Sequence, residues 1–319
     1  MEARYLELAI QAAREAGRIQ KARFGHSNRV ELKGEINPVT EVDLLCERII
    51  SETILGTFPD HDLFTEETSF KGKGSRWRWI VDPLDGTTNY IHRFPFFAVS
   101  IGLEVDGVME LGVAYDPVRD ELFHAARGTG AFLNGQRIHV SETEDLGQSL
   151  LCTGFPYDVR ENINDYLSYF RQFLMKGFAV RRPGSGVLDL CHLAAGHFDG
   201  FWEFKLHPWD VAAGSLIVTE AGGQVTGITG QPFSIYSKDI LASNGLIHPQ
   251  MIEAIREVEP HGLKPVAPPH ASEGRNPPKH TLLRSFRASK GTLSAFIHGL
   301  RDRGFLRRRV KSERTRQSA

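Results

Sequence analysis

Hydrophobic and polar residues recur with the period of a helix over the first part of the chain. In residues 2–24, apolar side chains lie three or four positions apart between Arg, Glu and Lys, which predicts an amphipathic helix. A second helix is predicted to start in residues 38–43, because Thr40 and Asp43 have the spacing of a capping box and apolar residues recur through 42–54. Residues 30–35, between the two helices, favour a short strand or a mobile loop.

The pattern then changes to short apolar runs separated by turn residues, which is typical of strands. The predicted strands are 61–67, 77–81, 97–103, 108–115, 121–125, 131–133, 137–140 and 149–154. Two dipeptides between neighbouring runs, Asp106-Gly107 and Asn134-Gly135, favour tight hairpin turns. The first 150 residues therefore predict two helices followed by a largely antiparallel sheet.

Helices and strands alternate in the second part of the chain. Helical periods lie at 162–176, 187–195, 210–221 and 249–259, and extended runs lie at 178–182, 198–204, Val225 and 240–242. Strands that alternate with helices predict a second layered α/β sheet over residues 151–259.

The character of the sequence changes after Glu259. Six prolines fall between positions 260 and 278, which is typical of a linker. Residues 281–300 then have a weak apolar pattern, and residues 301–316 are basic with little that could form a core. Residues 260–319 are therefore predicted to be a Pro-rich linker and a disordered basic tail with one transient helix.

The net charge of −1 conceals two parts of opposite charge. Residues 261–319 hold fourteen Lys or Arg and three Asp or Glu, a balance of +11. Subtracting these from the totals of 38 basic and 39 acidic residues leaves 24 and 36, a balance of −12 for residues 1–260. The basic tail fits either a solvated extension or a segment that binds RNA or another polyanion.

Composition sets the class and the expected compartment. With 319 residues, 41% hydrophobic and 24% charged, the chain is typical of a globular protein of one large or two medium domains. No apolar run approaches the length of about 18–20 residues that a membrane span needs, and the N-terminus lacks the apolar core of a signal peptide. The three cysteines are scattered without a C-x-x-C motif, as in core thiols of a reducing compartment, so a cytoplasmic location is expected.

The stretch W-I-V-D-P-L-D-G-T-T-N at 79–89 carries the clearest chemistry. Asp82 and Asp85 follow an apolar strand, and Pro83 is expected to end its ladder because proline has no N–H to donate. Gly86 can turn sharply, so that Thr87 or Thr88 opens a helix. Two carboxylates beside a helix N-terminus fit divalent cations that bind a phosphate; without cations, repulsion favours protonation of one of them.

Other interpretations of these acids follow from spacing alone. Asp82 and Asp85 could simply cap a turn, and Asp43 could simply cap its helix. Phosphatases with an aspartate nucleophile carry D-x-D-G-T, whereas the spacing here is D-x-x-D-G-T, one residue longer, so the motif favours metal binding over covalent catalysis. Glu66 and Glu67 could belong to a solvated loop.

Together these motifs resemble the inositol monophosphatase family. The family's first signature, W-I-V-D-P-[IL]-D-G-T-[TS]-N, is matched throughout at 79–89. The second, W-D-x-A-A-G followed by E-A-G-G, matches 209–214 and 220–223. The Glu66-Glu67 pair and the helix start at 38–43 also fit. The resemblance covers residues 1–259 and excludes the tail.

The resemblance implies an α+β fold, a layered αβαβα sandwich, in a homodimer that hydrolyses small phosphate monoesters with Mg²⁺. It implies an N-terminal half at about 1–150 and a C-terminal half at 151–259. Carried over by position, Glu66, Asp82 and the Leu84 carbonyl would hold a first metal, and Asp82 would bridge to a second metal shared with Asp85 and Asp210. Oxygen ligands without His or Cys select Mg²⁺ over Zn²⁺.

The remaining carried-over roles concern water and substrate. Asp43 and Thr87 would orient the attacking water, with Glu66 nearby and a third, weaker Mg²⁺ between Glu66 and Asp43. The N–H groups of Gly86 and Thr87 would contact the phosphate. Glu203 and the turn Gly184-Ser185-Gly186 would contact the alcohol part of the substrate, and Asp210 is also an implied substrate contact. Lys33 would lie in a loop that closes over the site.

The resemblance leaves the ester open between several sugar phosphates. Phe201-Trp202-Glu203 favours an inositol ring, so hydrolysis of myo-inositol monophosphate to myo-inositol and phosphate is the first hypothesis. Gly186 stands where bacterial relatives commonly have Ala, which loosens one wall of the sugar pocket. The alternatives are a fructose-1,6-bisphosphatase, a broader sugar or nucleotide phosphatase and, in a different class, a regulatory protein that binds RNA through the basic tail.

Overall fold

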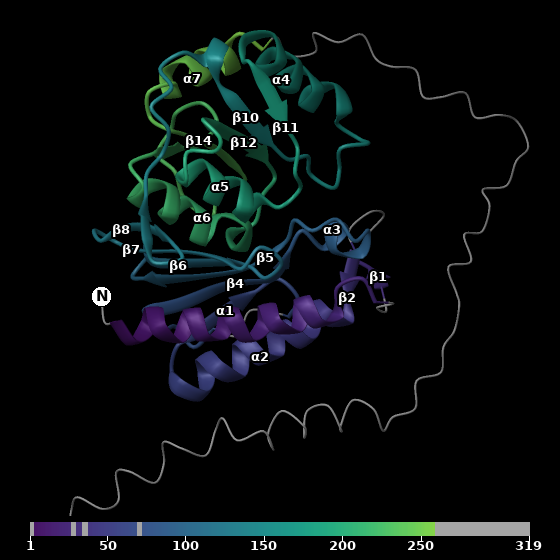
Figure 1. Cartoon of the computed structure of the whole chain (residues 1–319), viewed down its shortest axis with the longest axis vertical. Coiled ribbons are helices and arrows are strands. Elements are labelled where there is room, and N and C mark those ends of the chain that lie inside the picture. The colour runs from purple at the N-terminus through teal and green to yellow at the C-terminus, as the bar shows by residue number, and fades with distance from the viewer. Residues whose placement is uncertain (1–2, 27–29, 34–37, 69–71, 259–319) are drawn as a thin grey trace, which may run out of the picture. The chain divides into compact units, whose positions relative to one another are not determined.

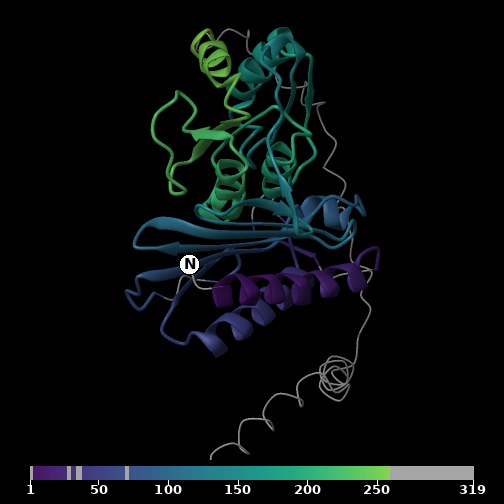
Figure 2. The ribbon, with the colours of Figure 1, turned by 60° about the vertical axis from the view of Figure 1, so that its left-hand side comes forward.

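The computed structural model describes residues 3–26, 30–33, 38–68 and 72–258. Within this part of the chain, two sheets alternate with three layers of helices (Figures 1 and 2). The outer layers are α1 (Ala3–Arg23) with α2 (Glu41–Thr57), and α4 (Ile163–Lys176) with α7 (His248–Arg256); the central layer is α5 (Gly186–Ala194) with α6 (Pro208–Glu220). The predicted α+β layered αβαβα sandwich is confirmed. The predicted linker and tail at 260–319 lie outside the described residues.

The first sheet has seven strands in sequence order. They are β3 (Asp62–Thr65), β4 (Trp77–Asp85), β5 (Ala98–Val105), β6 (Val108–Asp116), β7 (Glu121–Ala126), β8 (Gly130–Leu133) and β9 (Gln136–Ile138). Only β3 and β4 pair in parallel, so the predicted antiparallel character is confirmed for this sheet. Both predicted hairpin turns have positive φ at both central residues, 50° and 81° at Asp106-Gly107 and 50° and 80° at Asn134-Gly135.

The prediction that Pro83 ends the ladder of its strand was wrong. Strand β4 continues through Pro83, and Asp85 still pairs with Ala98 of β5. The register of the pairing shifts between Asp82 and Asp85, which is where the missing N–H would have been needed. The irregularity therefore bends the strand locally at the two acids without ending it.

The start of α2 combines a predicted and an unexpected feature. Thr40 is the N-cap, and the side chain of Thr40 and that of Asp43 form the predicted capping box. The residues just before it, Pro38–Thr40, form a short strand β2 that pairs with β1 (Val30–Leu32), whereas the sequence pattern placed a helix start there. Pro38 favours an extended backbone at this position, because its ring fixes φ and it donates no hydrogen bond.

The second sheet has five strands in the order β11-β10-β12-β14-β13. They are β10 (Leu150–Thr153), β11 (Ala179–Arg181), β12 (Gly200–Phe204), β13 (Gln224–Thr226) and β14 (Asp239–Ser243), and a short 3₁₀ turn at Leu146–Gln148 precedes them. Strand β10 pairs in parallel with β11 and β12, while β14 is antiparallel to β12 and β13. The carboxyl ends of β10, β11, β12 and β13 therefore lie at the same edge of this sheet.

The central helix α6 lies unusually close to the first sheet. A Cβ built on Gly112 would lie 2.6 Å from the carbonyl oxygen and 2.8 Å from the Cα of Ala213, and one built on Gly102 would lie 3.1 Å from the Cβ of Ala212. Glycines in β5 and β6 thus let the Ala-rich face of α6 contact the sheet backbone. This contact joins both halves around the site that lies between them.

The cysteines and the lengths of the helices bear on where the protein could reside. Cys46, Cys152 and Cys191 are free and buried. No helix in the described ranges is long and apolar enough to cross a membrane.

Candidate active site

The carboxyl ends of strands from both sheets meet around one cavity of about 240 Å³. Strands β3 and β4 end there, and so do β10, β11 and β12, because parallel strands expose the residues that follow them at the same edge. The cavity is lined by all but one of the predicted site residues: Glu66, Asp82, Leu84, Asp85, Gly86, Thr87, Gly184, Ser185, Gly186, Glu203 and Asp210. Lys33 also lines it, whereas Asp43 lies behind Thr87.

The turn after β4 requires glycine at position 86. Gly86 has φ of +93° and is the N-cap of the short helix α3 (Thr87–Ile91). A Cβ there would lie 3.0 Å from the carbonyl oxygen of Phe96 and 3.3 Å from that of Gly184. Asn89 of α3 donates to the carbonyl oxygens of Phe96, Pro183 and Gly184 at 2.8, 3.0 and 3.2 Å. The turn after β4 is thereby fixed to the turn before α5.

Asp85 and Asp210 are each held at the start of a central helix. One carboxylate oxygen of Asp85 accepts the Ser185 hydroxyl at 2.6 Å and the Val187 N–H at 2.9 Å, at the N-terminus of α5. Asp210 accepts the His207 N–H at 2.7 Å, within the first turn of α6. These bonds orient both carboxylates toward the region between the two helices and β4.

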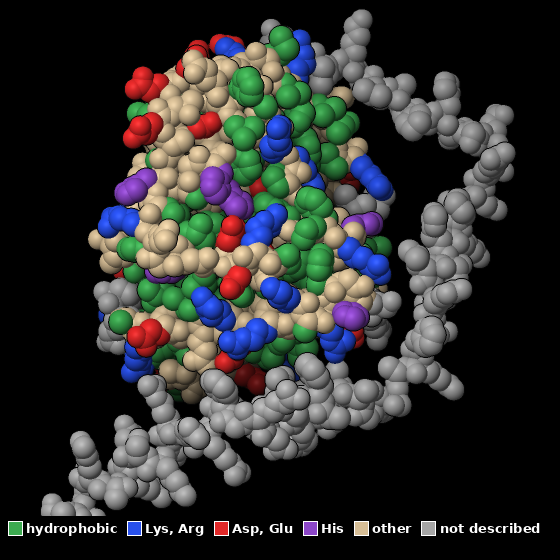
Figure 3. Space-filling model, viewed as in Figure 1, with side chains coloured by type: hydrophobic (Ala, Val, Ile, Leu, Met, Phe, Trp, Pro, Cys, Tyr) green, Lys and Arg blue, Asp and Glu red, His purple; other side chains and the backbone are tan. Residues whose placement is uncertain are grey.

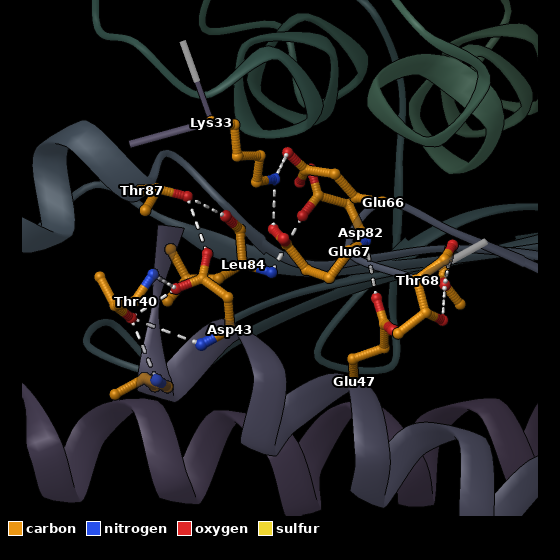
Figure 4. Close-up of polar contacts among 12 residues, drawn as sticks. Lys33, Thr40, Asp43, Glu47, Glu66, Glu67, Thr68, Asp82, Leu84 and Thr87 are labelled. Carbon is orange, nitrogen blue, oxygen red and sulfur yellow. Dashed lines mark hydrogen bonds and ion pairs between the residues drawn. The ribbon is translucent and has the colours of Figure 1, made fainter. Parts of the chain in front are cut away.

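Asp43, Thr87 and Leu84 form a connected group behind the cavity (Figure 4). The Thr87 hydroxyl lies 3.0 Å from Asp43 Oδ1 and 3.0 Å from the Leu84 carbonyl oxygen. The other oxygen of Asp43 accepts the Thr40 N–H at 3.0 Å, and Asp43 is fully buried. Burial raises the pKa of Asp43 to about 6, against the hydrogen bonds from Thr40 and Thr87. The same carboxylate thus caps α2 and contacts the site.

Lys33 lies between the two glutamates that follow β3 (Figure 4). Its ammonium is 2.8 Å from Glu66 Oε1 and 2.6 Å from Glu67 Oε1. The Glu67 N–H donates to Glu47 of α2 at 2.8 Å. Burial, followed by the charge of Glu66, raises the pKa of Glu67 to about 7. The glutamate pair is therefore anchored from α2 and faces a cation supplied by the chain itself.

Three aspartates at the cavity, one buried and two half-buried, share an unfavourable electrostatic environment. Burial, followed by the charges of Glu66, Asp85 and Asp210, raises the pKa of Asp82 well above its usual range. The pKa of Asp210 is raised in the same way, and that of Asp85 rises to about 6. On the face seen in Figure 3, by contrast, acidic and basic side chains are interspersed. The predicted repulsion between these acids is present, and a cation would relieve it.

The donor set fits divalent cations with oxygen ligands, although the side chains are not drawn together around one point. Within the described ranges, no group of three or more His, Cys, Asp or Glu side chains is arranged as a metal site. Asp82 and Asp210 each accept a backbone N–H on one oxygen, at 2.9 and 2.7 Å, which leaves the second oxygen for a ligand. Carboxylates and a carbonyl at an acidic cavity suit Mg²⁺. To hold the ion, the side chains would have to move together and the Lys33 ammonium would have to leave Glu66.

The other wall of the cavity carries Glu203, at the end of β12. A Cβ on Gly154 would lie 2.1 Å from Glu203 Oε1, so this glycine leaves room for the carboxylate, whereas one on Gly186 would make only an ordinary contact, 3.8 Å from Oε2. Burial, followed by the charge of Asp85, raises the pKa of Glu203 to about 8, while Arg182 lowers it. The predicted turn at 184–186 adjoins this wall.

Sequence reasoning missed several residues that line the cavity. They are Gly154, Phe155, Pro156 and Tyr157 after β10, Arg182 after β11, Asp189 in α5, and Lys205 and His207 before α6. The signal was available for the first two groups, because loops after parallel strands meet at one edge. For Asp189 the signal was an acid within the apolar run Val187-Leu188-Asp189-Leu190.

A layered fold with buried carboxylates at a polar cavity defines a class of phosphatases that depend on metal ions. The chain belongs to the inositol monophosphatase family, whose model matches residues 1–259. This resemblance, predicted from the two signatures, is confirmed, and phosphatase activity and the family's general dependence on metal come with it.

Similar proteins carry more than one functional description. The chain is 42% identical over 256 residues to the fructose-1,6-bisphosphatase/inositol-1-monophosphatase of Aquifex aeolicus, covering 80% of this chain and 96% of that one. It is 41% identical over 262 residues to the Nus factor SuhB of Escherichia coli (strain K12), covering 81% and 98%. The solved structure of inositol monophosphatase from Anabaena (Nostoc) sp. PCC 7120 aligns with a TM-score of 0.74 and 40% identity, covering 80% of this chain and 96% of that one.

Proposed function

We propose that this phosphatase hydrolyses myo-inositol monophosphate to myo-inositol and phosphate with Mg²⁺ as cofactor. The observation that carries the proposal is the set of three aspartates, Asp82, Asp85 and Asp210, which line a polar cavity and whose pKa values are raised. Such acids suit cations that in turn bind a phosphate. The Anabaena relative named as an inositol monophosphatase supports the choice of alcohol.

The residues of the chain divide into those that hold cations and those that hold water. Bound Mg²⁺ would supply charge neutralisation at the phosphate and a lowered pKa for a water molecule. The proposed ligands are Glu66, Asp82, Asp85, Asp210 and the Leu84 carbonyl oxygen. Thr87, which lines the cavity, would contact the attacking water, and Asp43 behind it would accept the Thr87 hydroxyl, so that the two residues together orient the water and Asp43 takes up its proton through Thr87.

The substrate would lie between the two walls of the cavity. The N–H groups of Gly86 and Thr87 at the start of α3 would donate to the phosphate. Glu203 and the turn 184–186 would contact the hydroxyl groups of the ring, Asp210 would adjoin the ester, and Lys33 would move from Glu66 toward the phosphate. The 2.8 Å between the Lys33 ammonium and Glu66 supports a position of Lys33 close to the proposed cation ligands.

The alternative substrates belong to the same chemical class. The Aquifex relative is named for both fructose-1,6-bisphosphatase and inositol-1-monophosphatase, which favours a test of both esters. The test is the kcat/KM of the purified protein with Mg²⁺ on myo-inositol 1-phosphate, fructose 1,6-bisphosphate and a nucleotide monophosphate. The proposal expects the inositol ester to have the highest value; a tenfold preference for either of the others would contradict it.

The assembly state and the compartment of the protein are also proposals. We propose a homodimer in the cytoplasm; the three free, buried cysteines support a reducing compartment. Sedimentation equilibrium of the full chain tests the dimer, which predicts twice the mass of 35.7 kDa.

The RNA-binding function predicted for residues 261–319 lies outside the described residues and stays a prediction. It requires salt-sensitive RNA binding that disappears when the tail is deleted.

A further inference from the structure

A second acid, Asp189, lies under the wall of the cavity that faces the alcohol side. Asp189 belongs to α5, one turn after the N-cap Ser185, and its side chain is 1% exposed. Both carboxyl oxygens are sealed from solvent and have no hydrogen-bond partner among the described residues. Because buried polar groups are nearly always hydrogen-bonded, an unpartnered acid at a ligand cavity indicates a functional role.

The neighbours of Asp189 indicate what that role is. Burial, followed by the charge of Glu203, raises the pKa of Asp189 well above its usual range, while Arg182 acts in the opposite direction. Burial thus favours the neutral form of the Asp189 carboxyl over the charged form, and a neutral carboxyl has one hydrogen to donate. Glu203 lines the same cavity and has an oxygen that can accept this hydrogen.

We propose that Asp189 is a positioning residue for the alcohol part of the substrate, acting through Glu203, and that the two acids together select phosphate esters whose alcohol carries free hydroxyl groups. The inference rests on the proposed phosphatase function and specifies its substrate class. When substrate binds, Asp189 donates to one oxygen of Glu203, and the other oxygen accepts a substrate hydroxyl. Gly154 leaves the space beside the Glu203 carboxylate in which it can turn between these partners.

The test compares two esters that differ in the alcohol. Myo-inositol 1-phosphate carries further hydroxyl groups, and p-nitrophenyl phosphate carries none. Asp189→Leu replaces the carboxyl by an apolar side chain and so removes the donor, and the KM for the inositol ester is expected to rise about tenfold, the loss of roughly one hydrogen bond. The kcat for both esters and the KM for p-nitrophenyl phosphate are expected to change less than twofold.

A conservative variant separates positioning from packing. Asp189→Asn keeps a donor that needs no proton, so its KM for the inositol ester is expected within about threefold of the wild type. Asp62→Asn is the matched control, because Asp62 is 1% exposed with one unpartnered oxygen but does not line the cavity. It is expected to leave both KM values unchanged. If Asp189→Leu does not fold, Asp189→Ala takes its place with the same expected result.

Three results would overturn the proposal. Equal changes in KM for the two esters in Asp189→Leu would show a general structural role. An unchanged KM for both esters would show that Asp189 does not position the substrate. An Asn variant as impaired as the Leu variant would show that the donor is not what matters. A wild-type protein that hydrolyses neither ester with Mg²⁺ would instead refute the proposed function itself, and this result is distinct from the others.

Discussion

Asp82 is buried and Asp210 is half-buried, and both have acidic neighbours, which is an unfavourable setting for charged side chains unless a cation is bound. The hydrogen bonds on Asp82 and Asp210 come from backbone N–H groups, so each carboxylate is oriented by the chain and not by an arginine or lysine. This distinguishes the pair from a surface ion pair.

The first prediction concerns these two acids. Asp82→Asn and Asp210→Asn keep shape and one acceptor oxygen but remove a negative charge from the proposed cation site. Turnover of myo-inositol 1-phosphate is expected to fall at least about 1,000-fold, in line with the loss of a group on which electrostatic catalysis depends. Circular dichroism should show an unchanged fold. Wild-type turnover in either variant would refute the assignment.

The second prediction concerns the space beside Glu203. A Cβ at Gly154 would collide with Oε1 of Glu203 at 2.1 Å, and a flexible side-chain end can move away at little cost. Gly154→Ala is therefore expected to raise KM for the inositol ester several-fold and to lower the melting temperature by no more than about 2 °C. Gly56→Ala is the control, since a Cβ there meets nothing within 4 Å. An unchanged KM would mean that Glu203 does not contact the substrate.

At the scale of elements, the contact between α6 and the first sheet sets the spacing of the site. Asp210 lies in the first turn of α6, and the helix contacts β5 and β6 through Gly102 and Gly112. Any change in this spacing moves Asp210 relative to Asp82 of β4.

The third prediction tests that contact. A Cβ at Gly112 would lie 2.6–2.8 Å from the backbone of Ala213, which cannot move without shifting the helix. Gly112→Ala is expected to destabilise the fold by about 2–3 kcal/mol, as overpacking in a core does. Urea unfolding measures the free energy, and Gly56→Ala is the control, because a Cβ there meets nothing within 4 Å. A change below about 0.5 kcal/mol would contradict the close packing.

Local sequence patterns predicted most elements, because helix period, capping boxes and hairpin dipeptides act over a few residues. Thr40 and Asp43 gave the start of α2, and Asp106-Gly107 gave a hairpin. What failed depended on partners far along the chain. Strand β4 continues past Pro83 because β5 pairs with Asp85 beyond it, and β2 exists because β1 lies opposite.

The site was predicted in composition but not in arrangement. The motif at 79–89 indicated cations and phosphate, and the acids it implied line one cavity. The ion pairs of Lys33 with Glu66 and Glu67, and the unpartnered carboxyl of Asp189, depend on tertiary packing that no local pattern contains. The roles of the individual residues stay predictions until the variants are measured.

At the scale of the whole molecule, a buried histidine connects α7 to two strands of the second sheet. His248, at the start of α7, lies 2.9 Å from the Thr226 hydroxyl of β13 and 2.9 Å from the Ser243 hydroxyl of β14. Burial lowers its pKa to about 4, so the folded protein holds it neutral. The unfolded chain binds its proton near pH 6.5.

The fourth prediction follows from this difference. Between about pH 6.5 and 4 the unfolded state binds more protons at His248, so its contribution to stability is full above pH 6.5 and is lost as the pH falls through that window. The wild type is expected to lose on the order of 1–3 kcal/mol more than His248→Gln from pH 7 to pH 4.5. Urea unfolding of both proteins at each pH gives the comparison. Parallel losses would contradict the assigned pKa.

The most direct test of the central claim is phosphate release from myo-inositol 1-phosphate, measured as Mg²⁺ is returned to protein treated with EDTA. If acids from β3, β4 and α6 bind the cofactor, release is absent without Mg²⁺. Phosphate release then rises over the same Mg²⁺ concentrations that raise the melting temperature. At a hundredfold excess of Mg²⁺ over Kd, binding stabilises the fold by about 2.7 kcal/mol. Phosphate release that proceeds equally in EDTA, or Mg²⁺ that leaves both release and melting unchanged, would contradict it.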